Sequence, residues 1–160
     1  MVDAMLDLLP KASVHHIGMY KTKNSLMPVQ YYNRLPRNTP CDVAFVCDVS
    51  IATASTMNAV ISMLKKWGAK KIIVIAILGS DMGIRAVIEN HPDVKVHVAS
   101  IDKELAADGT CIPGIGDCSD RMFSTPIEDV IEPSGEPICL TETNKRQRSN
   151  SDIHVSNGTR

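Results

Sequence analysis

Two short apolar runs with a helical segment between them constrain the fold of this chain most strongly. The runs cover residues 43–47 and 72–78, and their lengths suit buried strands, because a bilayer span needs about 20 apolar residues. Apolar residues recur at helical spacing from Met57 to Leu64, and Gly68 ends that pattern as a helix C-cap. Strands that alternate with helices in this way predict an α/β fold with a mostly parallel sheet and flanking helices.

Helix and turn signals predict the elements on either side of this unit. Helical spacing over residues 1–9 ends at Pro10, and a later helix starts at Ser80 or Asp81 and stops before Pro92. Residues 94–101 alternate between apolar and polar side chains, as a strand with one exposed face does. The remaining predicted elements are a strand over 14–20, a β-hairpin arm over 25–35 with Tyr31 and Tyr32, and a short helix over 117–123.

The composition excludes several classes of protein. The chain has 160 residues and a net charge of −1, so its overall charge does not indicate a nucleic-acid partner, and it has no apolar run long enough for a membrane span. The five cysteines include no Cys-x-x-Cys pair, which argues against a zinc site or a disulfide scaffold and favours a reducing, cytoplasmic setting. We therefore expect no metal-ligating residues, and the first residues lack the basic region of a signal peptide.

The chain changes character near residue 126. All aromatic residues lie before that point, and the rest is rich in Ser, Pro, Glu and Asn without periodicity. This shift predicts a folded domain over residues 1–125 and a disordered tail over 126–160.

Residues 48–56 have the clearest chemical character. Asp48 is expected at the carboxyl end of the first apolar run, and small and hydroxyl-bearing side chains lead into the helix. In an open α/β sheet, ligands bind beyond the carboxyl ends of the strands, and the N–H groups at a helix N-terminus attract phosphate. The pattern predicts a phosphate site in which Asp48 binds sugar hydroxyls or a metal-bound water. The alternative is that Asp48 only ends a strand and Ser55 or Thr56 only caps the helix.

Closely spaced glycines mark a second segment, residues 109–116. Glycines after a strand expose backbone N–H and C=O groups in a fixed pattern. Such groups can pair with the alternating acceptors and donors on the edge of a planar pyrimidine. The alternative is a plain glycine turn with no ligand.

These segments resemble motifs of the uracil phosphoribosyltransferases. Residues 48–56 read Asp-Val-Ser-Ile-Ala-Thr-Ala-Ser-Thr and resemble the family's phosphoribosyl pyrophosphate loop, Asp-Pro-Met-Leu-Ala-Thr-Gly-Gly-Ser/Thr. Residues 112–117 read Ile-Pro-Gly-Ile-Gly-Asp and are similar to the loop that holds uracil. Blocks in the family's order also occur at 18–20 (Gly-Met-Tyr), 91–94, 99–102 and 120–125. The resemblance covers residues 1–125, which match the C-terminal three-fifths or so of a family member.

The resemblance implies a phosphoribosyltransferase-like fold and a reaction that displaces pyrophosphate from phosphoribosyl pyrophosphate by uracil N1, giving UMP. It implies Mg²⁺ with the pyrophosphate, GTP as an activator, no nucleophilic side chain, and a homodimer or larger oligomer held by the arm. The implied catalytic residues are Asp48 and Asp117, and the implied uracil-binding residues are Cys111, Gly116, Asp117 and Cys118. The implied phosphoribosyl pyrophosphate-binding residues are Lys21, Asp48, Val49, Ser50, Ile51, Ala52, Thr53, Ala54, Ser55, Thr56 and Asp117.

Departures from the family pattern leave a second interpretation open. The sequence starts inside the helix that follows the family's pyrophosphate-binding Arg-Ala-Gly loop, so we expect the first elements of the domain to be missing. Ala54 and Ser55 replace the two loop glycines, and Lys21 replaces an arginine. If a loop glycine requires a positive φ, alanine or serine there is strained. The alternative function is therefore a catalytically impaired paralogue or fragment that acts as a nucleotide-binding or subunit-interaction module.

Overall fold

The computed structural model describes residues 1–21 and 27–124, with the side chain of Lys21 left out. The chain divides into two compact units, Met1–Gly116 and Asp117–Arg160, and each unit is described here by itself. The predicted disordered tail over 126–160 lies outside the described residues. The described helices include none that is long and apolar enough to cross a bilayer.

A three-stranded parallel sheet forms the centre of the first unit. Its strands are β3 (Val43–Ile51), β4 (Lys71–Ser80) and β5 (Lys95–Asp102), in the order β3-β4-β5. Helix α2 (Ser55–Trp67) connects the first pair of strands and α3 (Asp81–Asn90) connects the second. This alternation confirms the predicted α/β class, in which each parallel pair of strands is joined by a crossover helix.

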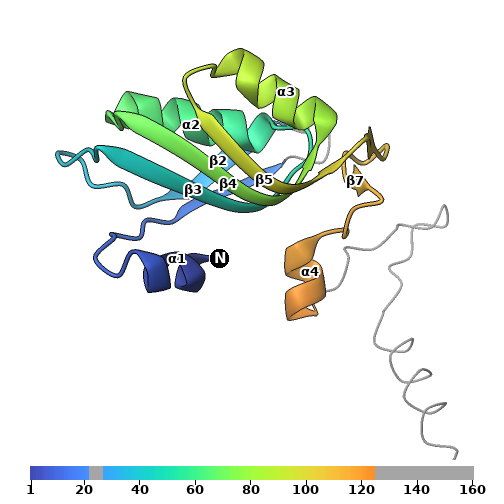
Figure 1. Ribbon diagram of the computed structural model, residues 1–160, viewed down its shortest axis with the longest axis horizontal. Helices are drawn as coiled ribbons and strands as arrows, with labels where there is room; N and C mark the ends of the chain where they lie inside the picture. Colours follow the sequence, from blue (N-terminus) through green and yellow to red (C-terminus); the bar gives the residue numbers. More distant parts are fainter. Residues whose placement is uncertain (22–26, 125–160) are drawn as a thin grey trace, which may run out of the picture. The chain divides into compact units, whose positions relative to one another are not determined.

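The core lies between the sheet and these two helices, which cover the same face (Figure 1). Strand β4 alternates accordingly: Ile72, Val74 and Ala76 are buried, whereas the intervening isoleucines are more exposed. From the helices, Ile61 and Val87 are fully buried against this face. The helical spacing read from the sequence thus predicts which side of α2 packs on the sheet.

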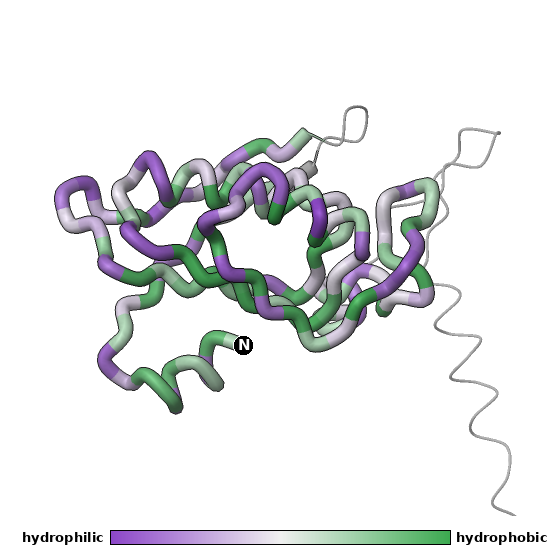
Figure 2. Tube along the Cα trace, turned by 45° about the horizontal axis from the view of Figure 1, so that its top comes forward, coloured by the Kyte–Doolittle hydropathy of each residue, from purple (hydrophilic) through white to green (hydrophobic). Residues whose placement is uncertain are grey.

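Two further elements precede the sheet. Helix α1 (Val2–Leu8) has apolar residues over most of its length (Figure 2), as the spacing over residues 1–9 predicts. Strands β1 (Ile17–Lys21) and β2 (Pro28–Asn33) pair antiparallel in a sheet of their own, so a hairpin arm is present. Its first strand is the one predicted separately over 14–20, and only its second strand lies in the segment 25–35. Tyr20 and Tyr31 expose 52% and 70% of their surface, and their ring centroids lie 6.2 Å apart.

A small hairpin ends the first unit, and the sequence did not predict it. Strand β6 (Glu104–Leu105) pairs antiparallel with β7 (Cys111–Ile112), and β7 lies in the segment 109–116 that was expected to be a loop. In the second unit, α4 (Cys118–Phe123) forms where the short helix was predicted.

Candidate functional site

Strand β3 continues four residues beyond its predicted end, and this corrects the expected position of Asp48. Asp48 pairs with Ala76 inside the sheet, and Ile51 pairs with Gly79. The extension occurs because β4 runs to Ser80 and offers partners along its whole length. The Oδ1 atom of Asp48 accepts a hydrogen bond of 2.8 Å from the N–H of Val49. Residues 52–54 alone therefore form the turn between β3 and α2.

The turn enters α2 through a left-handed residue. Ala54 is the N-cap, with φ +63°, and its side chain is buried. The expectation that Ser55 or Thr56 caps the helix was therefore wrong: Ser55 is already its first residue, and its Oγ lies 3.2 Å from Oγ1 of Thr53. An alanine N-cap has no side-chain acceptor for the first N–H groups of the helix, and the first turn contains no acidic residue. This end of α2 therefore keeps the positive end of the helix dipole uncompensated by its own side chains.

Hydrogen bonds and a close backbone approach fix the conformation of the glycine segment, residues 109–116. The turn between β6 and β7 is closed by Asp108, whose Oδ1 accepts hydrogen bonds from the N–H and the hydroxyl of Thr110. These bonds hold the pKa of the Asp108 carboxyl below its ordinary value, with the backbone N–H of Thr110 as the main cause. Gly114 has φ +54°, and a Cβ there would overlap the carbonyl oxygen of Cys111. Only glycine fits at this position.

The two predicted ligand loops lie next to each other. An added Cβ on Gly109, in the turn of the β6–β7 hairpin, would lie 3.2 Å from Cγ2 of Thr53 in the turn before α2. The backbone of one loop therefore approaches the side chain of the other.

Two residues that hold these loops by hydrogen bonds were not predicted from the sequence to have this role. Ser80 Oγ donates a hydrogen bond of 2.6 Å to the carbonyl oxygen of Ala52. Asp102 Oδ2 accepts one of 3.0 Å from the N–H of Gly114. The position of each residue, polar at the carboxyl end of an apolar strand, was the signal that could have identified it.

The remaining predicted site residues are placed as follows. The backbone of Lys21 ends β1 opposite Pro28. Cys111 is buried in β7, and Gly116 has φ +68°. In the second unit, Asp117 is the N-cap of α4, and its Oδ1 accepts hydrogen bonds from the N–H groups of Ser119 and Asp120. Cys118 is the first residue of α4.

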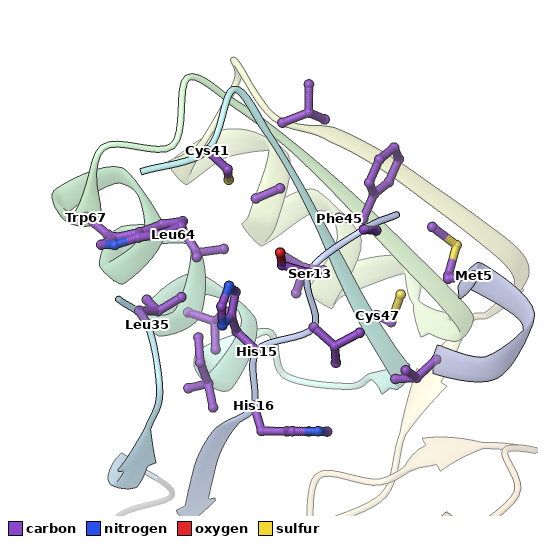
Figure 3. Close-up of a pocket in the computed structure, with 18 of the residues that line it drawn as sticks. Met5, Ser13, His15, His16, Leu35, Cys41, Phe45, Cys47, Leu64 and Trp67 are labelled. Atoms are coloured by element: carbon purple, nitrogen blue, oxygen red, sulfur yellow. The ribbon is translucent and has the colours of Figure 1, made fainter. Parts of the chain in front are cut away.

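A cavity of about 700 Å³ is lined by residues of α1, β3 and α2 (Figure 3). It includes six consecutive residues of β3, from Val43 to Asp48, and so follows the edge of that strand that faces away from β4. Figure 3 shows Met5 and Phe45 on one side and Leu35 and Trp67 on the other. Because its walls are mainly apolar, the cavity suits side-chain packing better than a phosphate group.

The described residues contain no group of three or more His, Cys, Asp or Glu side chains that could hold a metal ion. Mg²⁺ needs only one or two protein carboxylates when substrate phosphates coordinate it, and it usually keeps several waters. Asp48 offers one carboxylate in this part of the chain.

Comparison with known proteins finds one family over most of the chain. The family model described as "Uracil phosphoribosyltransferase" matches residues 1–125. Among curated relatives, a uracil phosphoribosyltransferase of Roseiflexus castenholzii is 42% identical over 125 residues, which is 78% of this chain and 60% of that protein. One from Dictyoglomus turgidum is 43% identical over the same shares.

A solved structure, that of the AQ2163 protein from Aquifex aeolicus, has the same architecture. The TM-score is 0.71 at 25% sequence identity, over 79% of this chain and 61% of that one. The chain thus spans about 60% of the length of the curated relatives that it matches.

Proposed function

The chain belongs to the uracil phosphoribosyltransferase family, and from this premise we propose that it joins uracil to phosphoribosyl pyrophosphate, giving UMP and diphosphate in pyrimidine salvage. In this reaction a bond forms between uracil N1 and ribose C1, and the bond from C1 to the diphosphate breaks. The proton of N1 leaves to solvent. The observation that supports the proposal is the close approach of the Gly109 backbone to the side chain of Thr53, which brings the loop proposed for the base beside the loop proposed for the phosphorylated sugar.

The phosphorylated sugar binds the turn between β3 and α2. The dipole at the start of α2 attracts a phosphate group, and the residues from Ala52 to Thr56 supply N–H and hydroxyl donors. The carboxylate of Asp48 binds the ribose hydroxyls and favours the positive charge that develops on the ring in an oxocarbenium-like transition state. The family resemblance assigns Lys21 to the same ligand.

The base binds the glycine loop. In the first unit, Cys111 and Gly116 present groups that pair with the edge of uracil. The family resemblance assigns base binding to Asp117 and Cys118 as well, and assigns Asp117 to the phosphorylated sugar. No side chain acts as a nucleophile, because holding the two substrates in the reactive geometry and stabilising charge supply the rate enhancement. Asp48 is the catalytic residue that the first unit supplies in this proposal, and the family resemblance assigns the same role to Asp117.

Magnesium fits this chemistry as a companion of the diphosphate. Asp48 would hold one of its waters, in keeping with the small number of carboxylates nearby. When bound, the ion neutralises negative charge on the departing diphosphate.

The proposal extends to assembly, location and regulation. The exposed Tyr20 and Tyr31 on the arm supply apolar surface for a second copy of the chain, so we include a homodimer or larger oligomer. Light scattering at micromolar concentration tests this, and a strictly monomeric mass argues against it. We also include a cytoplasmic location and activation by GTP, which the same assay tests when GTP is added.

The test of activity uses the full 160-residue chain with labelled uracil, phosphoribosyl pyrophosphate and MgCl₂. Labelled UMP is the expected product. Asp48→Asn removes a charge from the reacting centre and should lower kcat by about 100-fold, a typical loss for one stabilising group. The matched control is Asp42→Asn, at an exposed carboxylate paired with Lys70. If the wild-type chain neither forms UMP nor binds phosphoribosyl pyrophosphate, the proposal is wrong.

A further inference from the structure

Two buried polar residues lie on adjacent strands at the carboxyl edge of the sheet. Ser80 ends β4 and Asp102 ends β5, and the two residues are register partners. Ser80 is completely buried and Asp102 is 7% exposed, and within the described residues they are the two buried polar side chains. Because an unpaired buried polar group is costly, each hydrogen bond that they make is held firmly in place.

Ser80 connects the phosphate loop to α3. Its hydroxyl donates to the carbonyl oxygen of Ala52 at 2.6 Å and accepts from the N–H of Gly83 at 2.8 Å, so both of its roles are used. Gly83 lies so close that a Cβ there would overlap the same carbonyl oxygen. The loop therefore rests directly on the first turn of α3.

Asp102 connects the base loop to β5. Its carboxylate accepts from the N–H of Gly114 at 3.0 Å, across twelve residues of chain. Gly114 is also the residue that has φ +54° and a close approach to Cys111. The hydrogen bond thus fixes the loop at its most constrained point.

We propose that Ser80 and Asp102 act together as positioning residues, each holding one substrate loop so that the two loops face each other across the sheet edge. Neither residue is a catalytic residue. Ser80 acts through the backbone of Ala52, and Asp102 acts through the backbone of Gly114. The inference rests on the proposed function for the identity of the ligands, but the anchoring of each loop can be measured without any ligand.

Four variants of the full chain separate positioning from general stability. Ser80→Ala removes the anchor of the phosphate loop. Asp81→Ala is its control, because it removes the exposed ion pair with Arg85 from the same helix turn and leaves the Ser80 hydroxyl in place. Asp102→Ala removes the anchor of the base loop. Asp102→Asn is its control, because the amide Oδ1 still accepts a hydrogen bond.

The first measurement is amide hydrogen exchange of the unliganded variants. Ser80→Ala should speed exchange over residues 52–56, and Asp102→Ala should speed it over 111–116, each without changing the other loop. The two controls should resemble the wild type. If both alanine variants leave their loops unchanged, or if each loosens both loops and the sheet alike, the positioning role is overturned. The Asp102 pair decides the question if Ser80→Ala does not fold.

The second measurement is the binding of phosphoribosyl pyrophosphate with Mg²⁺, and of uracil, to the same variants. Misplacing a binding group costs affinity, and we expect about a tenfold rise in Kd for the sugar ligand in Ser80→Ala and for uracil in Asp102→Ala. If the exchange pattern is as expected but the wild type binds neither ligand, the proposed function fails and the loop anchoring stands. If all variants bind both ligands as the wild type does, the positioning role fails and the proposed function stands.

Discussion

Ala54 and Gly68 cap the two ends of helix α2, and both have a left-handed backbone conformation. Their φ values are +63° and +103°. At Gly68 this conformation carries no penalty, and its N–H caps the helix by bonding to the carbonyl oxygens of Leu64 and Lys65. At Ala54 the Cβ crowds the backbone, because alanine rarely adopts a positive φ. The turn that enters α2 is therefore strained at the point where the family pattern has glycine.

Replacing Ala54 with glycine should relieve this strain. We expect Ala54→Gly to raise the free energy of unfolding by about 1 kcal/mol, since the cost of a left-handed alanine exceeds the entropy that glycine gains in the unfolded chain. Urea unfolding followed by the fluorescence of Trp67, the single tryptophan of the chain, measures the change. The matched control is Ala52→Gly in the same turn, where φ is negative. For Ala52→Gly the free energy of unfolding should fall by about 0.5–1 kcal/mol. If both variants are less stable than the wild type, Ala54 is not strained.

Gly83 should not tolerate alanine, although it lies inside a helix. At an ordinary helical position, Gly→Ala stabilises a protein by about 1 kcal/mol. Here the new methyl group would overlap the carbonyl oxygen of Ala52. Forcing the two apart should cost about 1–3 kcal/mol, as overpacking does. Thermal unfolding measures the loss, with Met82→Ala at the exposed neighbouring residue expected to stay within about 0.5 kcal/mol.

The ion pair between Lys65 and Asp93 should stabilise the fold at neutral pH and lose this effect as the pH falls. The hydrogen bond from Lys65 Nζ, which lies 2.5 Å from Asp93 Oδ1, holds the pKa of this carboxyl below its ordinary value. Because the pKa of Asp93 is lower in the folded state, the pair contributes fully to the free energy of unfolding above the ordinary pKa of aspartate. This contribution is lost as the pH falls through the folded-state pKa. The pair is therefore fully formed at neutral pH and fails only in acid.

Substitution of the lysine tests this relationship. Lys65→Gln should raise the pKa of Asp93, measured by NMR titration of its carboxyl group, because the charged donor is lost. Lys66→Gln, at the exposed neighbouring lysine, should leave that pKa unchanged. An unchanged Asp93 pKa in the Lys65 variant would show that the pair does not form in solution.

Thr110 should control the pKa of Asp108 mainly through its backbone. The N–H of Thr110 is the first cause of the lowered Asp108 pKa, and its hydroxyl is the second. Thr110→Val removes only the hydroxyl, so the pKa should rise and still remain below its ordinary value. Thr110→Ser keeps both donors and should not change it. A full return to the ordinary value in Thr110→Val would mean that the β6–β7 turn depends on the hydroxyl.

The sequence was sufficient for the elements whose signals are local. The strand patterns, the Ser80 cap of α3 and the Gly68 cap of α2 all depend on neighbouring residues, and the structure contains each of them. The end of β3 could not be predicted in this way, because it depends on the length of β4, its partner in the sheet. The β6–β7 hairpin has strands of two residues each, too short for a periodic pattern.

The same distinction between local sequence signals and contacts with distant residues applies to the candidate site. The loop around Ala52 and Thr53 and the glycines near Gly114 have recognisable sequences. Their anchors do not, because Ser80 lies 28 residues from Ala52 and Asp102 lies 12 residues from Gly114. A serine and an aspartate at the ends of strands are common, and only the packing of the sheet shows that both are buried.

The strand order β3-β4-β5 also has a consequence for how the molecule folds. Each strand pairs with the next one along the chain, and the β1–β2 hairpin is likewise made of neighbours in sequence. The hairpin closes the shorter loop, since Lys21 pairs with Pro28, whereas each parallel pair of strands spans a crossover helix. Contacts that close short loops form quickly, so we expect the hairpin to form before the sheet. The hydrogen bond from Trp67 Nε1 to the carbonyl oxygen of Pro36, at 2.6 Å, joins residues that are also far apart in the chain. Burial of the single indole ring should therefore report the later non-local packing rather than the formation of the hairpin.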